Sequence, residues 1–199
     1  MISTLILILA SAYCWAEGVP GQEAGNPATG WIWKSKTPAD GEKVFFRREF
    51  ELPPNVASAT ISIVCDDWQH LYVNGVDLGM VGGWTTLKVH DVLPHLKQGG
   101  RNVITVEGRN NQGHAALALR FRATLKDGKK LHVVTDGTWV CSTEAPDGWR
   151  NLDFPTESWP KAVVVAKMGD APWGLVMPVE VEQSPGAAEL TDTPPPAAK

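Results

Sequence analysis

The chain has 199 residues, of which 43% are hydrophobic and 20% are charged, so it can bury one substantial core and is expected to form one domain. Its formal net charge is -4 at pH 7, and the sequence contains no basic run. This charge argues against electrostatic binding to nucleic acid or to an anionic membrane, and it favours a neutral partner.

The first sixteen residues resemble a secretory signal peptide. A short apolar run covers Leu5 to Ala12, and Cys14-Trp15-Ala16 ends in a small residue suited to signal peptidase. Cys14 also admits a lipoprotein interpretation, but Ser11-Ala12-Tyr13 lacks the usual lipoprotein pattern. We therefore expect cleavage after residue 16, export to the periplasm or the extracellular space, and no membrane insertion of the mature protein.

Cleavage would leave two cysteines, Cys65 and Cys141, in an oxidising compartment. A disulfide between them would close a long loop and add about 4 kcal/mol to stability if it were unstrained. The alternative is a pair of separate buried thiols, which we favour. Neither cysteine belongs to a haem motif or to a zinc cluster.

Apolar and polar residues alternate through most of the chain, which is typical of half-buried β-strands. The alternating apolar positions, in chain order, are Val44, Phe46 and Phe50; Ile61, Ile63 and Cys65; Leu71 and Val73; Leu87 and Val89; and Leu117, Leu119 and Phe121. Turn residues separate these segments at Pro53-Pro54, Asn74-Gly75, Gly82-Gly83, Gly99-Gly100, Asp127-Gly128 and Asp136-Gly137. Short strands with turns at this spacing predict an all-β sandwich or barrel.

Two local signals are more specific. Asn74-Gly75 predicts a two-residue type I′ hairpin turn, because both residues tolerate the positive φ that this turn requires. Val92 to Lys97 is the one segment expected to make a helical turn, with Asp91 as its N-cap and Gly99 beyond its end.

The two ends of the chain differ from its middle. Residues 17–30 are rich in Gly, Pro and Ala, and residues 179–199 are rich in Pro and Ala, so neither segment has enough apolar surface to order itself. We expect a flexible leader, a β-sandwich domain over residues 31–178, and a semi-extended tail.

Four stretches carry a resemblance to a known fold: Phe45 to Leu52, the Asp-Asp-x-x-x-x-Tyr-Val-Asn-Gly of Asp66 to Gly75, Asp91 to Gly108, and the Asp-Gly-x-Trp strand of Asp136 to Ser142. Their order and spacing resemble the galactose-binding-domain-like jelly roll, the N-terminal sugar-binding domain of family 2 glycosidases and bacterial α-L-rhamnosidases. Gly169 to Gly174 is similar to the segment with which these domains end. The resemblance implies a jelly-roll β-sandwich in one domain.

In those enzymes the jelly roll is an accessory module, and the catalytic carboxylates belong to a separate barrel that nothing in this sequence resembles. Asp66 and Asp67 are adjacent at a strand end, so their side chains should point to opposite faces and cannot form the carboxylate pair of a glycosidase. The sequence also lacks a Gly-x-Ser-x-Gly elbow and a phosphate-binding loop. We therefore expect a noncatalytic protein.

A sugar offers an apolar face to an aromatic ring and hydroxyls to amides and carboxylates. The candidate ligand-binding residues lie in loops expected at one end of the sandwich: Asp66, Asp67, Trp68, Trp84, Arg109, Asn110, Asn111 and His114. Trp68 is the expected stacking platform. The competing interpretation is that Asp67 caps a turn and that Asn110-Asn111 only shapes a loop. The tryptophans assigned instead to the core are Trp31, Trp33, Trp139 and Trp173.

No cofactor is expected. Related modules often hold a structural calcium ion, but this sequence has no Asp-x-Asp-x-Asp loop to support one. The histidines, at positions 70, 90, 95, 114 and 132, show no metal-ligand spacing. The expected partner is a glycan or a glycan-bearing surface. The alternative is a structural module that docks onto another exported protein or a glycoside hydrolase and has no sugar affinity of its own.

Overall fold

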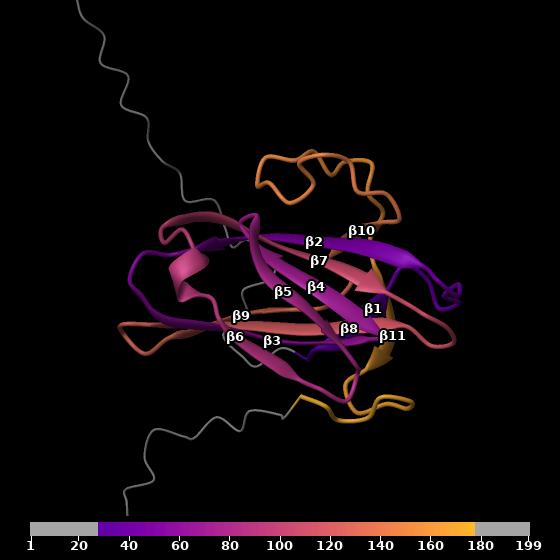
Figure 1. Ribbon diagram of the computed structural model, residues 1–199. Coiled ribbons are helices and arrows are strands. Elements are labelled where there is room, and N and C mark those ends of the chain that lie inside the picture. Colours follow the sequence, from indigo (N-terminus) through magenta and orange to yellow (C-terminus); the bar gives the residue numbers. More distant parts are fainter. Residues whose placement is uncertain (1–27, 178–199) are drawn as a thin grey trace, which may run out of the picture.

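The structure is a computed structural model that describes residues 28–177. In this part of the chain eleven strands form two antiparallel sheets that pack face to face (Figure 1). This arrangement confirms the predicted all-β sandwich. The predicted signal peptide, most of the leader and the tail lie outside the described residues, and strand β1 begins at Gly30, where the predicted leader ends.

Each sheet is built from strands that are distant in sequence. The six-stranded sheet has the order β11-β1-β8-β3-β6, with β9 paired to β8: β1 (Gly30–Trp33), β3 (Val56–Asp66), β6 (Lys88–Asp91), β8 (Ala116–Leu125), β9 (Lys130–Val134) and β11 (Val163–Lys167). The five-stranded sheet has the order β10-β2-β7-β4-β5: β2 (Lys43–Leu52), β4 (Trp68–Val73), β5 (Val76–Gly82), β7 (Gly100–Arg109) and β10 (Val140–Ser142). No helix among residues 28–177 is long and apolar enough to cross a membrane.

The main core lies between the two sheets. The alternating positions of β3 and β8 supply it, including Ile61, Ile63 and Leu119, which are fully buried. Trp33 and Trp139 also belong to this core, and Trp33 packs against Phe46 with ring centroids 5.4 Å apart. These two tryptophans therefore have the core positions that the sequence predicted.

A second cluster covers the outer face of the six-stranded sheet. Trp31 stacks on Trp173 at a centroid distance of 4.8 Å, and Met177 is buried with them. Trp31 and Trp173 thus pack as predicted, but in a cluster separate from the main core.

The prediction that Val89 is a half-buried strand position is wrong, because its side chain is 61% exposed. Val89 lies on edge strand β6 and pairs with Ser62 of β3. Ser62 lies between two core positions of β3 and therefore faces outward, and Val89 faces the same way.

The predicted hairpin turn is confirmed, and the predicted helical turn is present but differs in its length and in its N-cap residue. Asn74 and Gly75 have φ values of 50° and 80° and join β4 to β5 directly. The helical turn is a 3₁₀ helix, η1 (Leu93–His95), which is shorter than predicted because Leu96 is already extended. The N-cap residue is Val92 rather than the predicted Asp91, which lies one position earlier and accepts the Leu93 N–H with its Oδ1 at 3.1 Å.

The two cysteines are free and buried. Cys65 belongs to β3 and Cys141 to β10, so the thiols lie on strands of opposite sheets. Burial raises the pKa of Cys65 well above its ordinary value and that of Cys141 to about 11. The structure therefore has the separate thiols that the sequence analysis favoured.

Candidate functional site

A short link between the two sheets organises one end of the sandwich. Asp66 ends β3 in one sheet and Trp68 begins β4 in the other, with Asp67 between them and a cis peptide bond joining the two aspartates. The Asp67 N–H donates to the Arg109 carbonyl at 2.9 Å, and the Asn111 N–H donates to Asp67 Oδ2 at 2.6 Å. The structure therefore brings together the two loops that the sequence predicted to meet.

Asp66 is nearly buried in this link, with 8% of its surface exposed. The indole N–H of Trp173 donates to Asp66 Oδ2 at 2.8 Å. Burial raises the pKa of Asp66, and the neighbouring Asp67 carboxylate adds to this effect, while the Trp173 hydrogen bond and the nearby His114 oppose it. One carboxylate thus joins the link between the sheets to the segment that closes the domain.

Trp68 is the exposed aromatic residue of this region, with 42% of its surface open to solvent. Strand pairing places it opposite Gly82 on β5 and opposite Arg109 on β7. A Cβ atom at Gly82 would lie 2.6 Å from the Trp68 ring, so the ring can lie here only over a glycine. The indole is therefore held in a defined position while one surface stays open.

Two of the predicted site residues stabilise the loops. Asp67 accepts the backbone N–H of Asn111, and the side-chain amide of Asn110 donates to the Ala39 carbonyl at 2.9 Å. Asn110 is buried, and its Oδ1 has no hydrogen-bond donor among the described residues. The loop-shaping interpretation thus describes Asp67 and Asn110, whereas Asn111 exposes its side chain.

A hollow of about 610 Å³ opens beside the link. Its lining includes His114, Pro172 and Trp173, and the rings of His114 and Trp173 lie edge to face with centroids 6.2 Å apart. Sequence analysis assigned Trp173 to the core alone, although the closing motif of Gly169 to Gly174 marked its segment. Trp84 is partly buried against the Trp31 cluster and does not line the hollow.

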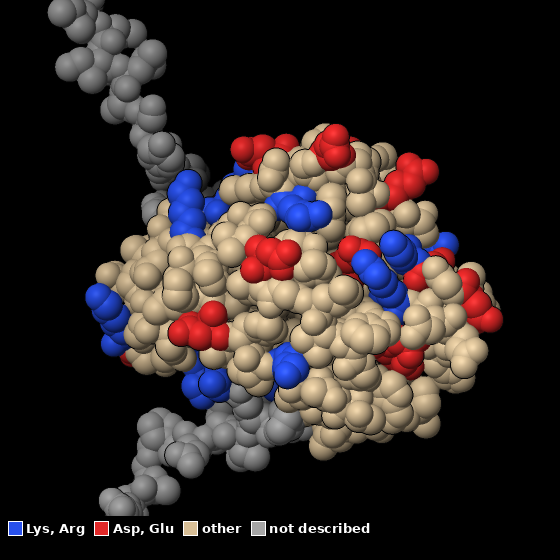
Figure 2. All heavy atoms as spheres, viewed as in Figure 1, with Lys and Arg blue, Asp and Glu red and all other residues tan. Residues whose placement is uncertain are grey.

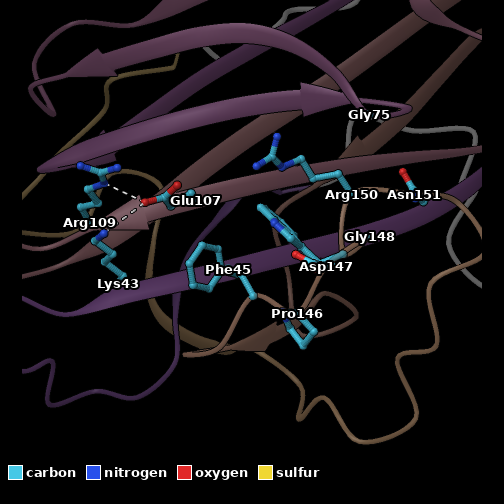
Figure 3. A pocket seen from close by; sticks show the side chains of 12 residues that line it. Lys43, Phe45, Gly75, Glu107, Arg109, Pro146, Asp147, Gly148, Arg150 and Asn151 are labelled. Carbon is cyan, nitrogen blue, oxygen red and sulfur yellow. Dashed lines mark hydrogen bonds and ion pairs between the residues drawn. The ribbon is translucent and has the colours of Figure 1, made fainter.

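A second hollow, of about 570 Å³, lies on the outer face of the five-stranded sheet (Figure 3). Arg109 is the one predicted site residue in its lining, and the sequence analysis proposed none of the others for ligand binding. The predicted residues therefore divide between the end of the sandwich and this outer face. Strand alternation explains the division, because the side chains of Trp68 and Arg109 lie on the outer side of the sheet.

The charge of the surface is mixed. On the face shown in Figure 2, acidic and basic side chains are interspersed, with broad uncharged areas between them. Across residues 28–177, no group of three or more His, Cys, Asp or Glu side chains is placed to hold a metal ion.

No protein-family model matches the chain. Over 160 residues it is 31% identical to an α-L-rhamnosidase of Streptomyces avermitilis, which covers 75% of this chain and 15% of the enzyme. The chain resembles one part of that enzyme. An α-L-rhamnosidase of Formosa agariphila is 28% identical over 126 residues, or 51% of this chain and 14% of the enzyme. The chain thus spans less than a fifth of the length of these relatives.

Solved structures also show a likeness between this chain and one part of an α-L-rhamnosidase. The Streptomyces avermitilis α-L-rhamnosidase complexed with L-rhamnose has a TM-score of 0.70 and 30% identity, over 79% of this chain and 17% of that one. A Pleurotus ostreatus lectin in complex with GalNAc has a TM-score of 0.67 and 26% identity, over 76% of this chain and 46% of that one. These likenesses confirm the predicted resemblance to a jelly-roll domain of α-L-rhamnosidases, and they relate the chain to a lectin.

Proposed function

We propose that this chain is an exported, noncatalytic carbohydrate-binding module that binds a glycan at the end of the sandwich. The observation that carries the proposal is the likeness of the chain to two proteins solved with sugars, one with L-rhamnose and one with GalNAc. Both are neutral monosaccharides, in agreement with the neutral partner expected from the composition.

The loops at this end of the sandwich, residues 66–68 and 109–114, form a rim that has the groups such a ligand needs. Trp68 offers an indole face to the apolar side of a sugar ring, because Gly82 leaves room for the indole to lie flat on the sheet. Asn111 and His114, in the loop between β7 and β8, supply exposed hydrogen-bonding groups. In this proposal Asp66 and Asp67 hold the loops in place through their contacts with Trp173 and Asn111.

A glycan-array screen of the purified chain, with and without calcium, tests the proposal. We expect specific retention of one sugar class, and we expect Trp68→Ala to abolish it with little change in Tm, since 42% of this residue is exposed. Val89→Ala is the matched control, because it removes an exposed apolar side chain from the edge of the other sheet. Loss of retention in both variants, or in neither, would contradict the assignment of the site.

A noncatalytic role has its own test. Asp66 and Asp67 are adjacent, and Asp66 is nearly buried, so they do not flank an open space in which a glycosidic bond could be cleaved. We expect no hydrolysis of nitrophenyl α-L-rhamnoside above the rate of a buffer blank. Turnover that is lost in Asp66→Asn would overturn this part of the proposal.

The second candidate function is docking onto a larger protein. The observation that favours it is the short span of the match, since the chain corresponds to 15% of the Streptomyces avermitilis enzyme, where this fold is one part of a long polypeptide. A blank array obtained with folded protein, together with stable association with an exported glycoside hydrolase, would support docking over sugar binding.

A further inference from the structure

The hollow on the outer face of the five-stranded sheet has a wall that is fixed in place. The connection from β10 to β11 stands beyond β10 and β2 (orange in Figure 1) and lines the hollow with residues 145–151. Arg47 is 1% exposed and donates to the carbonyls of Trp149 and Leu152 at 3.0 and 2.7 Å. A buried guanidinium that satisfies two loop carbonyls holds the wall against the sheet before any ligand arrives.

One cation in this wall is positioned but has no carboxylate partner. The guanidinium of Arg150 lies 4.2 Å from the centre of the Tyr72 ring and 5.6 Å from that of Trp149. Among residues 28–177, no Asp or Glu forms a salt bridge with Arg150. The Arg150 side chain donates no hydrogen bond to another of the described residues, so its N–H groups are available to an anion.

The other cations of the hollow are already paired. Arg109 Nε donates to Glu107 Oε1 at 2.8 Å, and Lys43 Nζ lies 3.9 Å from the same oxygen (Figure 3). Asp147 is the remaining acidic residue in the lining. The lining therefore holds three cations and two carboxylates, and Arg150 forms no salt bridge, although Asp77, which pairs with His70, also attracts it.

The rest of the lining is apolar or amide. Phe45 lies on the floor, with its ring 5.1 Å from that of Trp149 in an edge-to-face arrangement, and Pro146 and Asn151 lie in the wall. Aromatic and proline surfaces suit the C–H face of a pyranose, and the Asn151 amide suits its hydroxyls. The volume of about 570 Å³ is within the range of small-ligand sites.

We propose that this hollow is a second binding site, separate from the rim, that takes a saccharide bearing a carboxylate, with Arg150 binding the uronate and Phe45 contacting the sugar ring. The proposal does not depend on sugar binding at the rim. It assigns to the chain an acidic ligand in addition to the neutral one proposed above.

Calorimetric titration of the full chain with trigalacturonic acid tests this site. The fully methyl-esterified trisaccharide is the control for charge, and sodium acetate is the control for a carboxylate without a sugar. We expect the ester and Arg150→Gln each to weaken binding at least about tenfold, because a charge-assisted hydrogen bond is lost. Arg150→Lys should retain part of the affinity, since it keeps the charge but not the paired N–H groups.

Two further variants separate the possible outcomes. Asp147→Asn should strengthen binding by removing a negative charge from the lining, an effect that damage to the fold would not produce. His114→Ala, which changes the rim residue that lines the other hollow, should leave the affinity for trigalacturonic acid unchanged, and its loss in that variant would place the acid at the rim and overturn the proposal. Equal binding of acid and ester, full competition by acetate, or an unaffected Arg150→Gln variant would also overturn it.

Discussion

Gly108 on β7 has no room for a side chain, and replacing it with alanine should destabilise the fold. The added Cβ would lie 2.9 and 3.0 Å from two atoms of the Trp33 ring and 3.2 Å from Phe46. Both rings are fully buried, so neither can swing into solvent to relieve the contact. Overpacking of this kind costs about 1–3 kcal/mol, part of which is offset because alanine restricts the unfolded chain by about 0.4–1 kcal/mol.

Two other glycines serve as matched controls, because neither has a positive φ. Gly137 has no atom within 4 Å of an added Cβ, so Gly137→Ala should leave stability unchanged or raise it slightly. Gly82 would meet the Trp68 ring at 2.6 Å, but that ring is 42% exposed and can move outward. Gly82→Ala should therefore cost little stability and still abolish glycan retention by displacing the indole.

Calorimetry and urea unfolding measure these differences. For a domain of this size 1 kcal/mol corresponds to roughly 2–4 °C, so Gly108→Ala should lower Tm by several degrees while Gly137→Ala does not. A Gly108→Ala protein as stable as the parent would refute the argument from core packing. A Gly82→Ala protein that loses stability but keeps its glycan would refute the assigned role of Trp68.

Two predictions concern buried titratable groups. Folding raises the pKa of Asp66, so the contribution of this carboxyl to stability is present below the ordinary aspartate pKa and is lost as the pH rises through the folded pKa. The Asp66→Asn variant does not titrate, and its side-chain oxygen can still accept the Trp173 N–H. In urea unfolding this variant should therefore lose less stability than the parent between pH 4 and pH 7. A steeper loss in the variant would contradict this. Iodoacetamide should modify Cys65 and Cys141 only after unfolding, because burial raises both thiol pKa values, and a peptide map showing them disulfide-linked would contradict the structure.

The sequence predicted the features that depend on local chemistry. Alternation marked the strands that bury Ile61 and Leu119, and the Asn74-Gly75 turn followed from the φ values that these residues tolerate. The meeting of the Asp66 and Arg109 loops could be expected as well, because the resemblance supplied the order of the strands. The strands and the turn are specified by short segments of sequence, and the meeting of the two loops is specified by the order of the strands in the fold.

The features that were missed depend on contacts between distant segments. Residues 145–151 carry no strand signal, and their place against the sheet is set by hydrogen bonds from Arg47, about a hundred residues earlier in the chain. Trp68 and Arg109 were grouped with His114 because the loops meet, but alternation in β4 and β7 directs these two side chains to the outer face. Val89 faces solvent because β6 is an edge strand, which its own alternating sequence does not reveal.

The link of Asp66 and Asp67 also determines how this module could be redesigned. Because the same two residues carry the chain from one sheet to the other and support the proposed rim, we expect a substitution there to change folding and sugar binding together. Asn111 and His114 are exposed beside the link, and neither side chain carries the connection between the sheets. A library of variants for new sugar preference should therefore keep both aspartates and vary these two neighbours, so that selection acts on specificity without first removing unfolded proteins.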